Sequence, residues 1–208
     1  MTRGRFITFE GGEGAGKSTQ VARLVDRLRA RDLEVLHTRE PGGSTGAEEI
    51  RAIALNGDVG RWSAMTETLL MFAARSDHLD KTIRPALDAG RWVVCDRFAD
   101  STRAYQGAGG GVGGDLIECL DAAVVGGTQP DLTLIFDLPV EAGLQRAFGR
   151  GLFETRFESK GVAFHARLRR RFLEIAEEKA DRCVVIDAIG DLEAVEARVW
   201  AAVEGRLL

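Results

Sequence analysis

Residues 6–19 read Phe6-Ile7-Thr8-Phe9-Glu10-Gly11-Gly12-Glu13-Gly14-Ala15-Gly16-Lys17-Ser18-Thr19. A short apolar strand pattern here runs into the spacing GxxxxGKS, which extends from Gly11 to Ser18. A helical pattern follows, with apolar residues at Val21, Leu24, Val25 and Leu28. A strand, a glycine-rich turn and a helix in this order are typical of a phosphate-binding loop, and this context disfavours a chance match to the spacing.

The loop has the chemical groups that a triphosphate needs. Its glycines let backbone N–H groups turn inward, where a Cβ would obstruct the phosphates, and the next helix points its positive end at the same place. Lys17 supplies a charge for the β- and γ-phosphates, and the Ser18 hydroxyl can ligate Mg²⁺. We therefore expect a nucleoside triphosphate to bind. The expected binding residues are Gly11, Gly12, Glu13, Gly14, Ala15, Gly16, Lys17, Ser18 and Thr19.

Apolar runs alternate with helical patterns along the rest of the chain. Strands are expected at 5–9, 33–38, 92–96, 132–137 and 182–187. Helices are expected at 17–30, 45–54, 64–89, 116–125, 140–148, 161–180 and 192–206, and the glycine-rich stretch 107–114 is expected to be a loop. Short, continuously apolar strands between helices predict an α/β fold, a five-stranded parallel sheet covered on both faces. No linker divides residues 1–208, which predicts a single domain.

Composition limits the classes of function. The 208 residues are 45% hydrophobic and 29% charged, with a net charge of −4. An acidic balance gives no broad attraction to nucleic acid or anionic membrane, so neither is expected as a partner. The three cysteines are too few for a disulfide framework, and no signal peptide or membrane-spanning run is apparent. We expect a cytoplasmic protein.

Two further groups of residues point to phosphate chemistry. Asp96 ends an apolar run and, in a protein with a phosphate loop, is a candidate Mg²⁺ ligand, while Arg97 can grip a phosphate with its planar fork. The alternative is a helix-capping Asp96 beside a surface ion pair. Arg146, Arg150 and Arg156 follow a stretch, 104–145, with no Lys or Arg. They fit either a flexible cover over phosphates or a solvated helix end, and the residues alone leave both open.

Taken together, these segments resemble the thymidylate kinase family. The matching pieces are the loop itself, Thr38-Arg39-Glu40-Pro41-Gly42-Gly43, Asp96-Arg97-Phe98 with Ser101-Thr102, Ala104-Tyr105-Gln106-Gly107 and Pro130-Asp131-Leu132-Thr133. The resemblance implies a P-loop kinase fold and transfer of the γ-phosphoryl of ATP to dTMP, giving dTDP and ADP for dTTP biosynthesis. It also implies Mg²⁺ as a cofactor and a homodimer formed through helix faces such as those in 64–89 and 116–125.

The resemblance also implies roles for single residues at the donor side. The loop between Gly12 and Ala15 carries no basic residue, so the chain looks like the bacterial type, whose arginines come from a lid at about 146–160. The implied catalytic residues are Lys17, Arg97, Arg146, Arg150 and Arg156, with Arg150 the first choice for contact with the transferring phosphoryl. Ser18 and Asp96 are the implied Mg²⁺ ligands.

At the acceptor side, the resemblance implies that Glu13 contacts the sugar 3′-hydroxyl and that Arg75 bonds a thymine carbonyl. Tyr105 would pack against the deoxyribose, and Met71 or Phe72 would stack on the base. The full set of implied substrate-binding residues is Glu13, Arg39, Arg51, Met71, Phe72, Arg75, Arg97, Ser101, Thr102, Tyr105 and Gln106.

Other functions share parts of this pattern. The nearest is a P-loop kinase with another nucleoside monophosphate or a deoxynucleoside as acceptor. A regulatory P-loop NTPase is a second alternative, but the Asn-Lys-x-Asp segment by which a GTPase reads guanine is absent from the sequence. A nucleotide-binding module without catalysis is a third, and it is disfavoured because Lys17, Ser18 and Asp96 are all present.

Overall fold

The computed structural model of the protein describes residues 3–58, 60–149 and 160–208. Its centre is a five-stranded parallel sheet with the strand order β2-β3-β1-β4-β5. The strands are β1 (Phe6–Gly11), β2 (Val35–Arg39), β3 (Trp92–Asp96), β4 (Leu132–Asp137) and β5 (Cys183–Asp187). Each lies within two residues of its predicted bounds, and the predicted α/β fold is confirmed.

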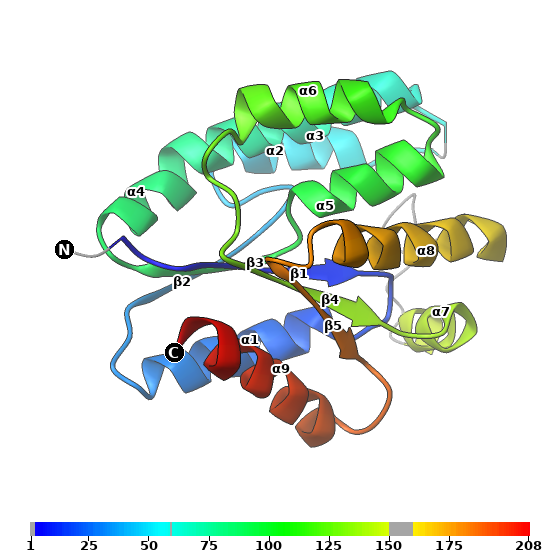
Figure 1. Ribbon diagram of the computed structural model, residues 1–208. Helices are drawn as coiled ribbons and strands as arrows, with labels where there is room; N and C mark the ends of the chain where they lie inside the picture. The colour runs from blue at the N-terminus through cyan, green and yellow to red at the C-terminus, as the bar shows by residue number, and fades with distance from the viewer. Residues whose placement is uncertain (1–2, 59, 150–159) are drawn as a thin grey trace.

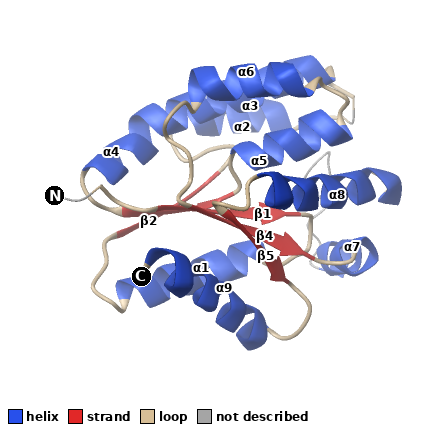
Figure 2. Cartoon of the chain, viewed as in Figure 1, coloured by secondary structure: helices blue, strands red, loops and turns tan. Residues whose placement is uncertain are grey.

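Helices cover both faces of this sheet (Figures 1 and 2). One face carries α1 (Lys17–Arg29) and α9 (Leu192–Leu207). The other helices are α2 (Thr45–Leu55), α3 (Ala64–His78), α4 (Arg84–Asp88), α5 (Ala99–Thr102), α6 (Gly114–Val124), α7 (Val140–Gly149) and α8 (Val162–Glu178). Ser44, Ser63 and Asp191 cap the starts of α2, α3 and α9 by accepting a backbone N–H with their side-chain oxygens.

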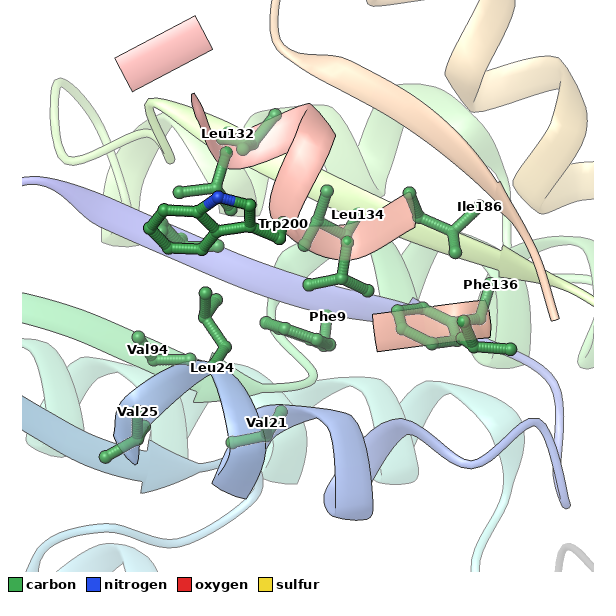
Figure 3. Close-up of a cluster of buried hydrophobic side chains, with 14 of the residues drawn as sticks. Phe9, Val21, Leu24, Val25, Val94, Leu132, Leu134, Phe136, Ile186 and Trp200 are labelled. Atoms are coloured by element: carbon green, nitrogen blue, oxygen red, sulfur yellow. The ribbon is translucent and has the colours of Figure 1, made fainter. Parts of the chain in front are cut away.

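The main hydrophobic core lies between the sheet and the α1–α9 layer (Figure 3). Phe9 of β1 stacks on Phe136 of β4 with 5.5 Å between ring centroids, and Leu24 and Trp200 reach the same cluster from the two helices. The central strands β1, β3 and β4 are mostly apolar and buried along nearly their whole length because both of their faces are covered. This packing fixes the carboxyl ends of β1 and β3. The phosphate loop follows the end of β1, and Asp96 is the last residue of β3.

The helices differ from the expectations in two places. The pattern 64–89 is helical from Ala64 to Asp88, as expected, but five of its residues form a π-helical segment, η1 (Leu79–Ile83), between α3 and α4. The stretch 107–114 was expected to be a loop, yet a second π-helical segment, η2 (Arg103–Gly109), extends into it and α6 begins at Gly114. Tyr105 explains the second difference, because its buried ring packs edge-on against α8 and outweighs the low helix propensity of the glycines.

Within the described residues, no helix is long and apolar enough to cross a membrane.

Candidate active site

The phosphate loop connects β1 to α1 and is held in place by its glycines. Gly11 (φ 129°) and Gly14 (φ 70°) have left-handed backbone conformations. A Cβ added at Gly11 would lie 2.4 Å from the Phe136 carbonyl oxygen, and one at Gly14 would lie 1.9 Å from the Gly143 carbonyl oxygen. At these two positions a Cβ would therefore collide with β4 and α7.

Gly12 provides a matched control, because a Cβ there would meet nothing within 4 Å. We expect Gly14→Ala to lower the free energy of unfolding by about 2–4 kcal/mol, since it combines strain with a backbone clash. We expect Gly12→Ala to change it by less than about 1 kcal/mol. Urea unfolding of the two variants tests this. Equal destabilisation by both substitutions would show that the loop does not pack against α7 as described.

Lys17 and Ser18 lie at the start of α1, beside the end of β3. The Lys17 ammonium donates to the carbonyl oxygens of Gly11 (3.1 Å) and Gly12 (2.7 Å). Burial disfavours its charge, aided by the nearby Arg97, and lowers the Lys17 pKa to about 8. Ser18 Oγ donates to a carboxylate oxygen of Asp96 at 2.5 Å. The two expected Mg²⁺ ligands therefore lie side by side.

Glu13, Arg97 and Tyr105 form the second part of the site. Arg97 donates to the Glu13 carboxylate at 3.0 Å, and the Tyr105 hydroxyl donates to the same oxygen at 2.5 Å. Burial opposes ionisation of Glu13, but the charges of Arg97 and Lys17 outweigh it and lower the Glu13 pKa to about 2. Arg97 has a φ of 71° and also donates to the Gly11 carbonyl oxygen. It thus links the phosphate loop to the segment after β3.

Glu10 was not among the predicted site residues, although it lies in the conspicuous stretch 6–19. Its carboxyl is completely buried and accepts the backbone N–H groups of Phe98 and Ser101 and the Ser101 hydroxyl, at 2.6–3.2 Å. Burial and the neighbouring Asp100 charge raise the Glu10 pKa to about 7. Glu10 therefore fixes the turn that carries Arg97. An acidic residue inside an apolar strand was the signal for it in the sequence.

Arg75, near the end of α3, forms the third part of the site. Its Nη2 donates to the Phe98 carbonyl oxygen and to the Thr102 hydroxyl, both at 3.1 Å, and its Nε donates to Glu40. Its Nη1 is buried and has no hydrogen-bond partner among the described residues. Gln106, from η2, donates to Glu67 at 2.8 Å.

Most of the residues described above, though not Glu10 or Glu67, line one cavity of about 350 Å³ at the carboxyl ends of the strands. This is the edge of a parallel sheet at which ligands bind in open α/β folds. The predicted residues that line it are Glu13, Gly14, Ala15, Gly16, Lys17, Ser18, Arg39, Arg51, Met71, Arg75, Asp96, Arg97, Ser101, Thr102, Tyr105 and Gln106. The cavity is also lined by residues that were not predicted as site residues, namely Glu40, Pro41, Leu55, Phe98 and Ala147.

Other predicted residues lie outside the cavity lining. Phe72 is buried beneath Arg75, whose guanidinium carbon is 5.0 Å from the ring centroid, so of the two candidates for stacking only Met71 faces the cavity. Gly11, Gly12 and Thr19 do not contribute to the lining. Arg146 donates to the Ala188 carbonyl oxygen after β5, at 3.4 Å. Arg150 and Arg156 lie outside the described residues, as does most of the expected lid at 146–160.

Arg39 and Arg51 bring positive charge to the cavity from the second strand and the helix after it. Arg39 pairs with Glu48 at 3.0 Å, and Arg51 donates to the Pro41 carbonyl oxygen at 2.6 Å. Including Lys17, Arg75 and Arg97, five cationic side chains of the described residues line one cavity. The cavity is therefore suited to a second phosphate group in addition to the triphosphate at the loop.

A phosphate loop that opens into a cavity lined by further cationic side chains, at the edge of the parallel sheet of an α/β fold, is typical of the class of P-loop nucleotide kinases. A sequence model of the thymidylate kinase family matches residues 9–199, and the chain belongs to that family. It is 61% identical to "Thymidylate kinase" of Caulobacter vibrioides over 207 residues, which cover 100% of this chain and 99% of that protein. It is 54% identical to the protein of the same name from Nitrobacter winogradskyi, and the match covers 99% of this chain and 90% of that protein.

A solved structure gives the same result for the fold. The crystal structure of thymidylate kinase from Ehrlichia chaffeensis has a TM-score of 0.79 and 33% identity, and the match covers 97% of this chain and 99% of that one. The protein is accordingly an ATP-dependent kinase that phosphorylates dTMP to dTDP. The expectations for its fold, family and reaction are confirmed.

Proposed function

We propose that the single cavity holds both substrates, with the triphosphate of ATP on the loop at Lys17 and dTMP between Arg97 and Arg75. Phosphoryl transfer between two phosphates needs alignment and neutralisation of charge more than covalent help. Lys17 would offset charge on the β- and γ-phosphates. Arg97, Arg39 and Arg51 would hold the phosphate of dTMP close to them despite the repulsion between the two anions.

The sugar and the base of dTMP would occupy the part of the cavity between Glu13 and Arg75. Glu13 is ionised at any working pH, so its carboxylate can accept a hydrogen bond from the 3′-hydroxyl. Tyr105 would pack against the deoxyribose, with Ser101 beside it. Met71 would cover one face of the base, and we assign the other edge of the base to Thr102 and Gln106.

Ser18 and Asp96 fit a magnesium ion. Both offer hard oxygen ligands, and they are already in contact at 2.5 Å. Among the described residues no three His, Cys, Asp or Glu side chains gather as a metal site. A set of one carboxylate and one hydroxyl suits Mg²⁺ in kinases, where phosphate oxygens and waters complete the coordination. Held by Ser18 and Asp96, the ion would supply positive charge that offsets the negative charge on the phosphates during transfer.

The lid and the assembly complete the proposal. We assign Arg150, with Arg146 and Arg156, to the transferring phosphoryl, on a lid at about 146–160 of a single domain, 1–208. We also propose a homodimer in the cytoplasm, because Met65 and Leu69 lie one turn apart on α3 and are 45% and 49% exposed. Sedimentation velocity at micromolar concentration tests the dimer, and a monomer at all concentrations would contradict it.

The observation that carries the base assignment is the unpartnered Nη1 of Arg75. A buried donor without an acceptor costs about 1–3 kcal/mol, so a ligand carbonyl placed there gains that amount. A coupled assay with Mg-ATP and dTMP, dUMP, dCMP, dGMP or AMP tests this. We expect dTMP to have the highest kcat/KM and dCMP, which presents an amino group, to be at least about 10²-fold poorer. Comparable use of dCMP would contradict the assignment of Arg75.

A further inference from the structure

A chain of buried polar groups lies behind Arg75, and the proposed reaction does not use it. Arg75 Nε donates to Glu40 Oε2 at 2.8 Å. The other oxygen of Glu40 is 3.0 Å from His78 Nδ1, and His78 Nε2 is 2.7 Å from Thr38 Oγ1. All four residues are at most 8% exposed, and His78 is completely buried. His78 does not line the cavity.

The direction of these hydrogen bonds follows from the chemistry of the groups. A carboxylate oxygen can only accept, so His78 Nδ1 carries a proton and donates to Glu40. In the neutral ring Nε2 then accepts from the Thr38 hydroxyl. The turn after β2 packs directly on His78 and Thr38, because a Cβ added at Gly43 would lie 2.3 Å from His78 Nε2 and 2.4 Å from Thr38 Oγ1. The imidazole is therefore fixed from both sides.

Two of the three guanidinium nitrogens of Arg75 donate hydrogen bonds to neighbouring residues. Glu40 holds Nε, while the Phe98 carbonyl oxygen and Thr102 hold Nη2. The rings of Phe72 and Phe98 lie 5.0 and 5.3 Å from the guanidinium carbon. Because the guanidinium is planar, fixing two nitrogens determines the direction of the third. That third nitrogen, Nη1, is the one without a partner among the described residues.

We propose that His78 is a positioning residue for substrate choice: through Glu40 it sets the orientation of Arg75, so that Nη1 meets a carbonyl on the acceptor base. This orientation of Arg75 would favour a pyrimidine that presents a carbonyl to Nη1. A pyrimidine with an amino group at the same position would place its own donor against the Nη1 donor. A site built to hydrogen-bond one group discriminates strongly against an analogue that lacks it. The proposal rests on the assignment of Arg75 to the base.

Two substitutions of His78 separate its two hydrogen bonds. The amide nitrogen of asparagine stands close to the position of Nδ1 and can still donate to Glu40. The longer side chain of His78→Gln places its amide near Nε2 and loses the bond to Glu40. For His78→Gln we expect the KM for dTMP to rise about five- to tenfold, with kcat within about twofold, and the preference for dTMP over dCMP to fall by a similar factor. For His78→Asn we expect both quantities to stay close to wild type.

A double-mutant cycle with Arg75→Ala then tests whether His78 acts through Arg75. In the Arg75→Ala background, His78→Gln should raise the KM for dTMP no further, because residues that act through one another are not additive. Additive effects would overturn the proposal. So would a His78→Gln variant that melts at a lower temperature but keeps the wild-type preference for dTMP, since that is the behaviour of a merely structural residue.

The same experiment tells two failures apart. If Arg75→Ala itself leaves the preference for dTMP over dCMP unchanged, the base assignment fails, and the role of His78 with it. If Arg75→Ala abolishes the preference while His78→Gln does not alter it, only the positioning role fails. Should His78→Gln not fold, Thr38→Val is the second variant, because valine has the shape of threonine but lacks the hydroxyl that bonds His78 Nε2. We expect it to change the KM for dTMP and the preference for dTMP over dCMP in the same direction, by about half as much on a logarithmic scale.

Discussion

Replacement of Arg97 by alanine should lower kcat/KM for dTMP by about 10³-fold while the Kd for ATP changes by less than about threefold. Arg97 lies between the loop carboxylate Glu13 and Ser101, with hydrogen bonds of 3.0 and 3.2 Å to them. In Arg97→Ala, this guanidinium would no longer offset the repulsion between the phosphate of dTMP and the triphosphate of ATP. Steady-state kinetics with varied dTMP, together with calorimetric titration of ATP, measures the two effects separately.

Two controls make this result specific. Arg97→Lys keeps the charge but loses the planar fork, so it should recover only part of the lost rate. Arg171→Ala removes an arginine that pairs with Glu178 on α8 and does not line the cavity, so it should leave both constants unchanged. If Arg97→Ala weakened ATP binding and dTMP use equally, the residue would serve the loop rather than the acceptor.

The sequence predicts the donor side of this site well because its chemistry is local. Gly11 to Ser18 are contiguous, and the strand before them and the helix after them fix how they lie. The same reasoning places Asp96 at the end of β3, where the structure brings it to Ser18. Each of these predictions depends only on a motif and on the rule that parallel strands end at one edge of a sheet.

The acceptor side depends on contacts that no local pattern contains. Glu40 and Arg75 are 35 positions apart, and only the packing of α3 against the turn after β2 brings them together. Neighbouring helix positions differ by about 100° in direction, so the choice between Met71 and Phe72 is set by how α3 is rotated in the fold. Glu10 was not predicted for the same reason, because burial of its side chain depends on the segment after β3.

Replacement of Lys17 by methionine should reduce kcat by at least about 10³-fold and, at pH 7, make the ligand-free protein more stable. The ammonium is buried and its pKa is lowered to about 8 from the 10.5 of an unfolded chain, chiefly because burial disfavours the charge. Keeping it charged therefore costs the folded state about 3 kcal/mol. Methionine has a similar length and no charge, so it removes that cost but also loses two hydrogen bonds to loop carbonyls. The expected net gain is roughly 1–2 kcal/mol.

The gain should depend on pH in a direction set by the lowered pKa. Below about pH 8, Lys17 is charged in both the folded and the unfolded state, and the full cost is present. Between about pH 8 and 10.5 the unfolded state binds more protons than the folded state, so the stability of the wild type rises with pH and the advantage of Lys17→Met shrinks. Urea unfolding of both proteins at pH 7 and near pH 10 measures this difference. A variant less stable than wild type at pH 7 would mean that the bonds from Lys17 to the loop outweigh its burial, and that the loop is held together by the same charge that binds the phosphates.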